Sequence, residues 1–366
     1  IGPRVGFSYN PDKHDKNVIR GGFSVMFAPQ PWDDYNLAVS TSPTLPMRVT
    51  LSRSDGLAMG VRFPSFNDDL RPLIEGRGGV QFGYAFDPHI QCPYTMNVYL
   101  GVQRALSPTL MIESGFVGNR GVKYRLDRIF NWPDRVTDVR PNPALGQGSY
   151  YNAGQNTVYY AWQTDVRRRY SRGAAFNFHY TWGKVLSYTG GDTGAHMNGD
   201  TFDAVQDFFD VRRDRGPSSG DHTHQFAADW IYVLPSFASV RSRAARGIIG
   251  DWQISGIFSA RSGIATNITQ SGLITRADYV GGDPINRNYK RDGVYLNKAA
   301  FAMVPLGKGG NPIRPGNLGN QAIRGTGMWN IDFSLGKNFP ITERRKLEIR
   351  ADMFNVLNYT PYSGFT

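Results

Sequence analysis

Residues 329–353 read WNIDFSLGKNFPITERRKLEIRADM. Apolar residues alternate with polar ones from Trp329 to Leu335, and the alternation returns from Leu347 to Met353 after a short turn at 339–345. Because successive side chains of a strand point to opposite faces, this stretch predicts a β-hairpin with one apolar and one charged face. Soluble sheets and membrane barrels both alternate in this way, so the fold depends on which face lies outside.

The same two-residue periodicity recurs along the chain and predicts ten strands in all. They are residues 3–9, 18–27, 97–106, 109–117, 158–170, 174–185, 225–234, 251–261, 328–338 and 346–354. The links after the first, third, fifth and ninth strands are short, and the link after the seventh is of medium length. The links after the second, fourth, sixth and eighth strands each have about 40 to 70 residues.

This alternation of short and long links separates a membrane fold from a soluble one. Long irregular links are uncommon in compact soluble domains, whereas outer-membrane barrels have short periplasmic turns and long extracellular loops. The pattern therefore predicts an all-β fold, an antiparallel up-and-down transmembrane β-barrel with long extracellular loops. Residues 1–366 would form one partial barrel domain of about ten strands.

One face of the predicted strands is apolar and is expected to contact outer-membrane lipid. Its large aromatic residues are candidates for girdles at the membrane interfaces: Trp162, Tyr180, Trp182, Trp230, Tyr232, Trp252 and Trp329. The charges on this face, Arg104, Arg168 and Lys184, are expected beside short turns. There their long stems can carry the charge into water.

The other face is polar and is expected to line the lumen. Its charged residues are the candidate contacts of a solute or a plug domain, and bracing of the wall is the alternative role: Arg20, Arg167, Arg169, Asp229, Asp332, Glu348, Arg350 and Asp352. The three charges at 348–352 are predicted to face Asp332 on the neighbouring strand in a ladder of ion pairs. Asp165, Arg167 and Arg169 are expected to behave in the same way.

Composition argues against several other classes of protein. The chain has 41 Lys and Arg against 30 Asp and Glu, a net charge of +11, but the positive residues are scattered. We therefore expect no nucleic-acid partner. No stretch approaches the roughly 18 apolar residues of a membrane helix. The single cysteine, Cys92, allows no disulfide within the chain.

Few motifs suggest chemistry. The run Asp221-His222-Thr223-His224 is the best metal candidate, but it lacks a third ligand at a defined spacing, so no metal site is predicted. There is no nucleophile elbow, phosphate-binding loop or dinucleotide fingerprint. The sequence therefore predicts neither an enzyme nor a bound cofactor.

Three stretches carry a family resemblance. They are GPRVGFSY (2–9) with VIRGGF (18–23), RGPSSGD (215–221) followed by HQF (224–226) and YVLP (232–235), and RGTG (324–327) with LEIRADMFNVLN (347–358). Together they resemble the barrel of TonB-dependent outer-membrane transporters, specifically the Oar-like group. The resemblance follows nearly the whole chain in order.

The resemblance implies a bacterial outer membrane and a complete barrel of about 22 strands. It also implies uptake or export of a bulky solute through a polar lumen, with capture by extracellular loops, a plug domain as gate and a TonB-type energy-coupling protein as partner. This chain shows no plug domain, no earlier strands and no final strand after Asn358. It is therefore interpreted as a fragment whose strands do not close into a barrel alone.

Two other functions stay open at this point. One is a surface adhesion or assembly protein built on the same barrel and acting through its long loops. The other is a soluble, secreted β-protein that binds carbohydrate through its aromatic residues. Behaviour without detergent separates the soluble protein from the two membrane proteins.

Overall fold

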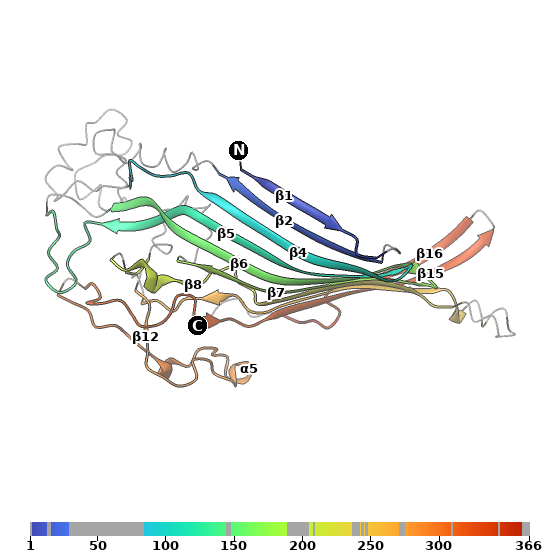
Figure 1. Cartoon of the computed structure of the whole chain (residues 1–366). Helices are drawn as coiled ribbons and strands as arrows, with labels where there is room; N and C mark the ends of the chain where they lie inside the picture. The colour runs from blue at the N-terminus through green and yellow to red at the C-terminus, as the bar shows by residue number, and fades with distance from the viewer. Residues whose placement is uncertain are drawn as a thin grey trace, which may run out of the picture.

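The computed structural model describes residues 2–12, 16–28, 84–143, 148–188, 205–207, 209–235, 242, 245, 248–270, 275–308, 310–342 and 345–360. Ten long strands lie side by side in one sheet, in chain order (Figure 1). They are β1 (Arg4–Tyr9), β2 (Asn17–Phe27), β4 (Tyr94–Ser107), β5 (Leu110–Phe130), β6 (Gly148–Ser171), β7 (Ala174–Ser187), β9 (His224–Val233), β10 (Trp252–Arg261), β15 (Met328–Thr342) and β16 (Arg345–Met353). Each pairs antiparallel with its neighbours. The predicted all-β, up-and-down antiparallel fold is confirmed.

Strands β5 and β6 are much longer than the alternation predicted, which was 109–117 and 158–170. Their pairing shifts register between Gly121 and Tyr124 and again between Tyr124 and Leu126. Lys123, between these points, has a left-handed φ of 63°. A β-bulge adds a residue and disrupts the alternation of side chains between the faces. The two-residue pattern therefore stops although the strands continue, and the expected long link is mostly strand.

The sheet is open. Its path runs from β1 to β16, and among the described strands these two end strands do not pair with each other. The strands run from the long connections to the short turns, where the β15–β16 hairpin projects (Figure 1). The predicted failure of these ten strands to close agrees with this arrangement.

Short elements collect at the end of the sheet that carries the long connections, here called the loop end. Strand β3 (Tyr84–Phe86) pairs parallel with β6, and β8 (Gly216–Pro217) pairs with β7. Between β10 and β15 lie β11 (Ala265–Thr266), β12 (Asp278–Tyr279), α5 (Tyr289–Asp292), η3 (Lys298–Ala300), β13 (Phe301–Ala302) and β14 (Ile323–Arg324). A further short helix at this end is η2 (Val211–Asp214). No helix in the described ranges is long and apolar enough to cross a membrane.

The apolar core also lies at the loop end. Leu126, Ile129 and Val205 are buried together, and Trp132, Tyr188 and Val211 pack against them. The central part of the ten-stranded sheet forms a single layer with two accessible faces, which is the architecture of a barrel wall.

Candidate functional site

The strand register aligns apolar residues of neighbouring strands on one face of the sheet. Phe116, Trp162 and Trp182 lie directly opposite one another on β5, β6 and β7. Phe258 on β10 lies opposite Ile331 on β15. Trp162 is 49% exposed and Trp182 58% exposed. A continuous exposed apolar face of this size is suited to lipid rather than water. We call the strand positions that are in register with these residues the apolar face. In β5 this face extends only as far as Gly121, and in β6 it begins at Thr157.

The three predicted charges on the apolar face do not all lie beside short turns. Arg104 lies near the end of β4, and Arg168 donates from Nη2 to the carbonyl of Ser171 at 3.3 Å, so both are close to a short turn. Lys184 lies opposite Tyr160 at the loop end of β7. That part of the prediction was wrong, because β7 runs away from its short turn for ten residues before it reaches Lys184.

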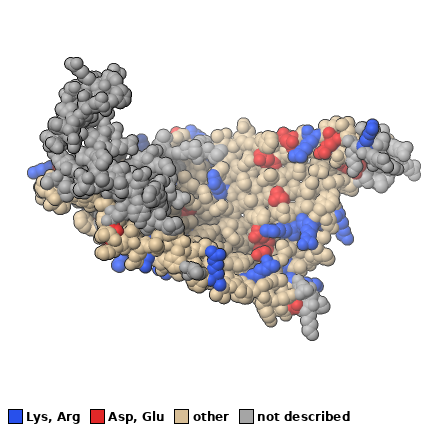
Figure 2. Space-filling view, turned by 90° about the horizontal axis from the view of Figure 1, so that it is seen from above, with Lys and Arg blue, Asp and Glu red and all other residues tan. Residues whose placement is uncertain are grey.

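The register also places the predicted lumen residues. Arg20, Arg167, Arg169, Asp229, Asp332, Glu348, Arg350 and Asp352 all occupy strand positions on the face opposite the apolar one, here called the polar face. Seen from above, acidic and basic side chains are interspersed over the sheet (Figure 2).

Hydrogen bonds between side chains join neighbouring strands on the polar face. Asn119 Nδ2 donates to Asn97 Oδ1 at 2.6 Å, and Asn97 Nδ2 donates to Ser24 Oγ at 3.3 Å, so one ladder spans β5, β4 and β2. Asn177 Nδ2 on β7 donates to Asp229 Oδ2 on β9 at 2.8 Å. Asp229 therefore has a wall-bracing contact.

A row of titratable side chains crosses the middle of this face. The Tyr99 hydroxyl donates to Glu113 Oε1 at 2.8 Å. Glu113 lies directly opposite Asp165, and Asp165 Oδ1 lies within hydrogen-bonding distance of His179 Nδ1. Asp165 thus pairs across strands with His179, and the predicted ladder with Arg167 and Arg169 on its own strand is wrong.

The predicted ion-pair ladder is confirmed only for Arg350 and Asp352 on β16, and Asp332 of β15 takes no part in it. The cross-strand neighbours of Glu348, Arg350 and Asp352 are Asn338, Gly336 and Ser334. Arg350 Nε donates to Asp352 Oδ1 at 2.8 Å along its own strand and to Ser334 Oγ at 2.9 Å.

Asp332 has a different role from the one expected. Its Oδ1 accepts from the Asn355 backbone N–H at 2.8 Å and from Asn330 Nδ2 at 2.9 Å. The pairing of β15 with β16 runs only from Phe333 to Thr342, so Asp332 lies beyond it and holds the turn that follows β16.

Three of the predicted lumen arginines have no acidic partner among the residues that the structure describes. Among the residues that the structure describes, no carboxylate lies within ion-pair distance of Arg20, Arg167 or Arg169. Arg20 lies opposite Gly101, and Arg167 lies opposite Asn177. Guanidinium groups left without a carboxylate can bind carboxylate or phosphate groups of a solute or of another domain.

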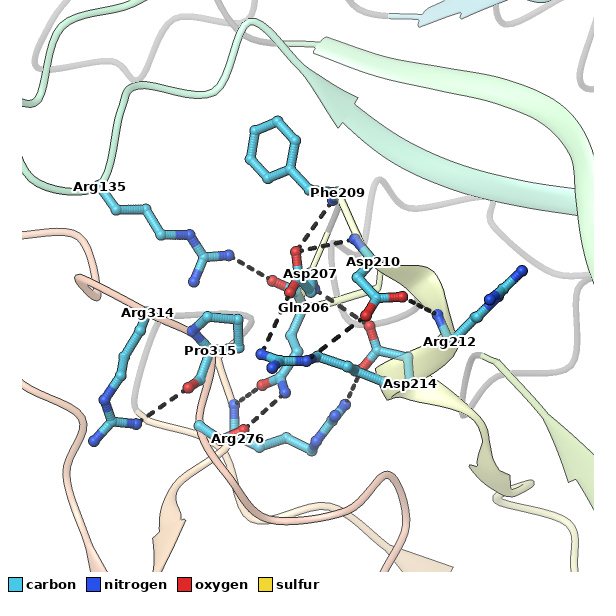
Figure 3. Close-up of polar contacts among 12 residues, drawn as sticks. Arg135, Gln206, Asp207, Phe209, Asp210, Arg212, Asp214, Arg276, Arg314 and Pro315 are labelled. Carbon is cyan, nitrogen blue, oxygen red and sulfur yellow. Dashed lines mark hydrogen bonds and ion pairs between the residues drawn. The ribbon is translucent and has the colours of Figure 1, made fainter.

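At the loop end, a buried polar network joins the connections 131–143, 205–223 and 262–327 (Figure 3). Arg276 is its centre. Its Nη1 lies 2.5 Å from Asp214 Oδ1, and its Nε donates to the Leu318 carbonyl at 2.8 Å. Both side chains of this ion pair are almost completely buried, at 5% and 0% exposed. Burial raises the pKa of Asp214, and Arg276 opposes that rise.

Gln206 links all three connections. Its Oε1 accepts from the Arg276 N–H at 3.0 Å, and its Nε2 donates to the Gly316 carbonyl at 3.0 Å. Its own carbonyl accepts from Arg135 Nη2 at 2.8 Å. Burial lowers the pKa of Arg135, and Asp207 and Asp214 oppose that fall.

Residues 221–224, the metal candidate that the sequence did not favour, form a second group of polar contacts at the loop end. Asp221 forms an ion pair with Arg324 and accepts from the Val185 N–H at 2.6 Å. His222 Nδ1 lies 2.7 Å from the Ser262 carbonyl, and His224 Nδ1 lies 2.8 Å from the Tyr180 hydroxyl. The three side chains contact different partners, and the described part of the chain contains no group of metal-binding residues.

Sequence reasoning missed this network, because its partners are far apart in the chain. Asp221 and Arg324 are 103 residues apart. Both belong to stretches that carry the family resemblance, RGPSSGD and RGTG, but nothing in a single sequence shows that they pair. Asp278 and Arg314 form a third pair, with a bidentate contact at 2.9 and 2.6 Å.

The open antiparallel sheet, its exposed apolar face and its polar face define a wall of a transmembrane β-barrel. Residues 1–364 match the family described as outer membrane beta barrel domain, and the chain belongs to this family. The protein is therefore an outer-membrane β-barrel protein and is located in the bacterial outer membrane. No curated protein has a matching sequence.

Several solved outer-membrane transporters are similar in structure. The outer membrane transporter YddB of Escherichia coli has 11% identity and a TM-score of 0.47, over 98% of this chain and 37% of that one. The FrpB iron transporter of Neisseria meningitidis has 10% identity and a TM-score of 0.42, over 99% and 35%. The ferripyoverdine receptor of Pseudomonas aeruginosa has 11% identity and a TM-score of 0.46, over 99% and 29%. The chain therefore spans about a third of the length of these proteins.

Proposed function

We propose that this chain is the C-terminal barrel part of an Oar-like TonB-dependent transporter, and that a bulky solute passes along its polar face. The observation that carries the proposal is the separation of the two faces. Mixed charges lie on one face, including Arg20, Arg167 and Arg169, which have no carboxylate within ion-pair distance among the described residues, and the other face is apolar and exposed. A wall of this kind separates an aqueous lumen from lipid.

In this function Arg20, Arg167 and Arg169 contact the solute or the plug. Their guanidinium groups suit acidic partners, whether carboxylate or phosphate. The residues with wall contacts, such as Asp229 and Asp332, mainly hold neighbouring segments in place. The connections at the loop end form the mouth at which the solute is first captured. A plug domain and a TonB-type coupling protein complete the transporter.

The proposal is tested with single cysteines in the intact protein, as its gene encodes it, in a Cys92→Ser background. Arg167→Cys on the polar face should react with a charged, membrane-impermeant thiol reagent in cells whose outer membrane has been made permeable. Ile349→Cys on the apolar face should not react, although Ile349 is 58% exposed in the structure. Equal reaction at both positions would show that the polar face does not line an aqueous lumen.

The same Arg167→Cys protein separates transport from adhesion. An energy-coupled plug moves within the lumen, so the labelling rate should change when the energy-coupling protein is deleted or the proton gradient is collapsed. An adhesion protein on the same barrel has no such coupling, and its labelling rate would stay unchanged. Ile349→Cys serves as the control for general effects on the membrane.

A further inference from the structure

The apolar face carries charge of one sign only. Across the ten strands its charged positions are Arg104, Arg120, Arg168, Lys184, Lys337 and Arg345, and it contains no Asp or Glu. The polar face of the same strands contains six acidic residues: Glu113, Asp165, Asp229, Asp332, Glu348 and Asp352. Long basic side chains can reach water from an apolar face more easily than acidic ones, so the positions and contacts of these cations decide which of them could bind an anion.

The cations fall into two groups along the strands. Arg104, Arg168, Lys337 and Arg345 lie toward the short turns, and Arg168 and Lys337 have contacts within the protein. Lys337 is buried, donates to the Gly250 carbonyl, and lies over the ring of Trp252 at 5.3 Å. Arg168 donates to the Ser171 carbonyl. These contacts hold the side chains against the protein, so this group is mainly structural.

The second group, Arg120 and Lys184, lies toward the loop end and is exposed. Among the described residues, neither has a hydrogen bond from its side chain or a carboxylate within ion-pair distance. Arg120 lies opposite Val158, and Lys184 lies opposite Tyr160. The two cations therefore flank β6 at successive positions of the same face, roughly 12 Å apart at their backbones. Their long stems allow both charged groups to reach one anion above Tyr160.

Exposed aromatic residues mark this part of the face as a membrane interface. Tyr160 is 53% exposed. The next residues on this face are Trp162, two residues from Tyr160 on β6, and Trp182, two residues from Lys184 on β7. Aromatic belts lie at the level of lipid headgroups, and the long connections place this end outside the cell. An anion at that depth, on the lipid side of the wall, is a headgroup phosphate.

We propose that Arg120 and Lys184, with Tyr160 between them, bind the phosphate groups of a phosphorylated glycolipid in the outer leaflet of the outer membrane. The proposal rests on the membrane location of the apolar face and the outward orientation of the loop end. It does not depend on transport. A labelling result that contradicts transport would not contradict lipid binding. A loss of lipid binding in the variants would not contradict transport through the lumen.

The test uses the intact protein in detergent and native mass spectrometry, with diphosphorylated lipid A as the probe. Each cation near a charged membrane surface contributes enough that replacing both, in Arg120→Gln with Lys184→Gln, should weaken binding roughly 30-fold. The charge-conserving pair Arg120→Lys with Lys184→Arg should keep most of the binding. Heat-dependent mobility on gels shows that each variant still folds as a barrel.

The matched control removes the same charge elsewhere at the loop end. Arg212→Gln with Lys290→Gln replaces two exposed cations outside the strands and should bind the lipid as the wild type does. Equal loss of binding in this control would show a general charge effect and overturn the site. Equal binding of fully dephosphorylated lipid A would overturn phosphate recognition. If phosphatidylglycerol bound as tightly as lipid A, and if this binding also depended on Arg120 and Lys184, the assignment to a glycolipid would be overturned.

Discussion

At the scale of single residues, buried ion pairs hold the connections of the loop end together. Asp214 and Arg276 are charged side chains inside a small folded unit, and each also contacts backbone groups from other segments. Such a pair contributes little net stability compared with apolar packing, but removing one partner leaves an uncompensated charge. We therefore expect the pair to determine which segments of the connections lie together more than to add net stability.

Replacing Arg276 by alanine should open the loop end without unfolding the sheet. The loss of its partner leaves Asp214 buried alone, which costs about 3–5 kcal/mol. Hydrogen exchange should show lost protection at Ala277 and Leu318, whose N–H groups bond within this unit. Arg287→Ala removes an arginine that is 88% exposed in its pair with Asp283 and should change little. Equal protection in both variants would contradict a central role for Arg276.

The loop end should also lose stability in acid. The hydrogen bonds from Arg314 hold the pKa of Asp278 below its usual value. A carboxyl of this kind stabilises the folded state above its unfolded pKa of about 3.9, and the contribution is lost as pH falls through the lower folded pKa. Asp214, whose pKa burial raises, acts in the opposite sense.

This acid sensitivity is measured by hydrogen exchange of the Asn317 N–H, which donates to Asp278 Oδ1 at 3.0 Å. Protection should fall below about pH 4 in the wild type. Asp278→Asn should have lower protection at neutral pH and a much flatter profile. A wild-type profile that stays flat to pH 3 would contradict the assigned pKa shift.

At the scale of the element, the two-residue period is reliable where a strand is uninterrupted. It located β15 and β16 closely, because one face meets an apolar and the other a polar environment. It failed in β5 beyond Gly121, where two bulges reset the faces. A bulge depends on backbone geometry. Lys123 has a left-handed φ, but a lysine is not a residue type that signals such a conformation in the sequence.

The β4–β5 pair depends on a close backbone contact at Gly115. A Cβ there would lie 2.8 Å from the Cα of Gly101 and 2.9 Å from the carbonyl oxygen of Leu100. Backbone atoms cannot move aside, so Gly115→Ala should destabilise the sheet by about 1–3 kcal/mol. Gly101→Ala is the control, because its Cβ meets only the flexible end of the Tyr99 side chain. Urea unfolding followed by tryptophan fluorescence should rank Gly115→Ala as the more damaging change.

At the scale of the whole molecule, the open sheet has two edge strands, β1 and β16, whose outer backbone groups pair with no other described strand. Exposed edges of this kind cannot be accommodated in lipid. Produced alone, residues 1–366 should therefore aggregate or pair with other copies. The intact protein should instead run as a single heat-modifiable barrel. A monomeric, heat-modifiable barrel formed by residues 1–366 alone would contradict this expectation.

The sequence by itself determined the ten strands, their order and their two faces, because strand periodicity is local and the link lengths are visible in the chain. It also indicated which charged residues share the polar face. Only the tertiary structure decided their partners: Asp165 with His179, Asp332 with the turn after β16, and Arg20, Arg167 and Arg169 without a carboxylate among the described residues. It also revealed the folded loop end. Pairing in space between residues such as Asp221 and Arg324 follows from the path of the whole chain, and no local pattern records it.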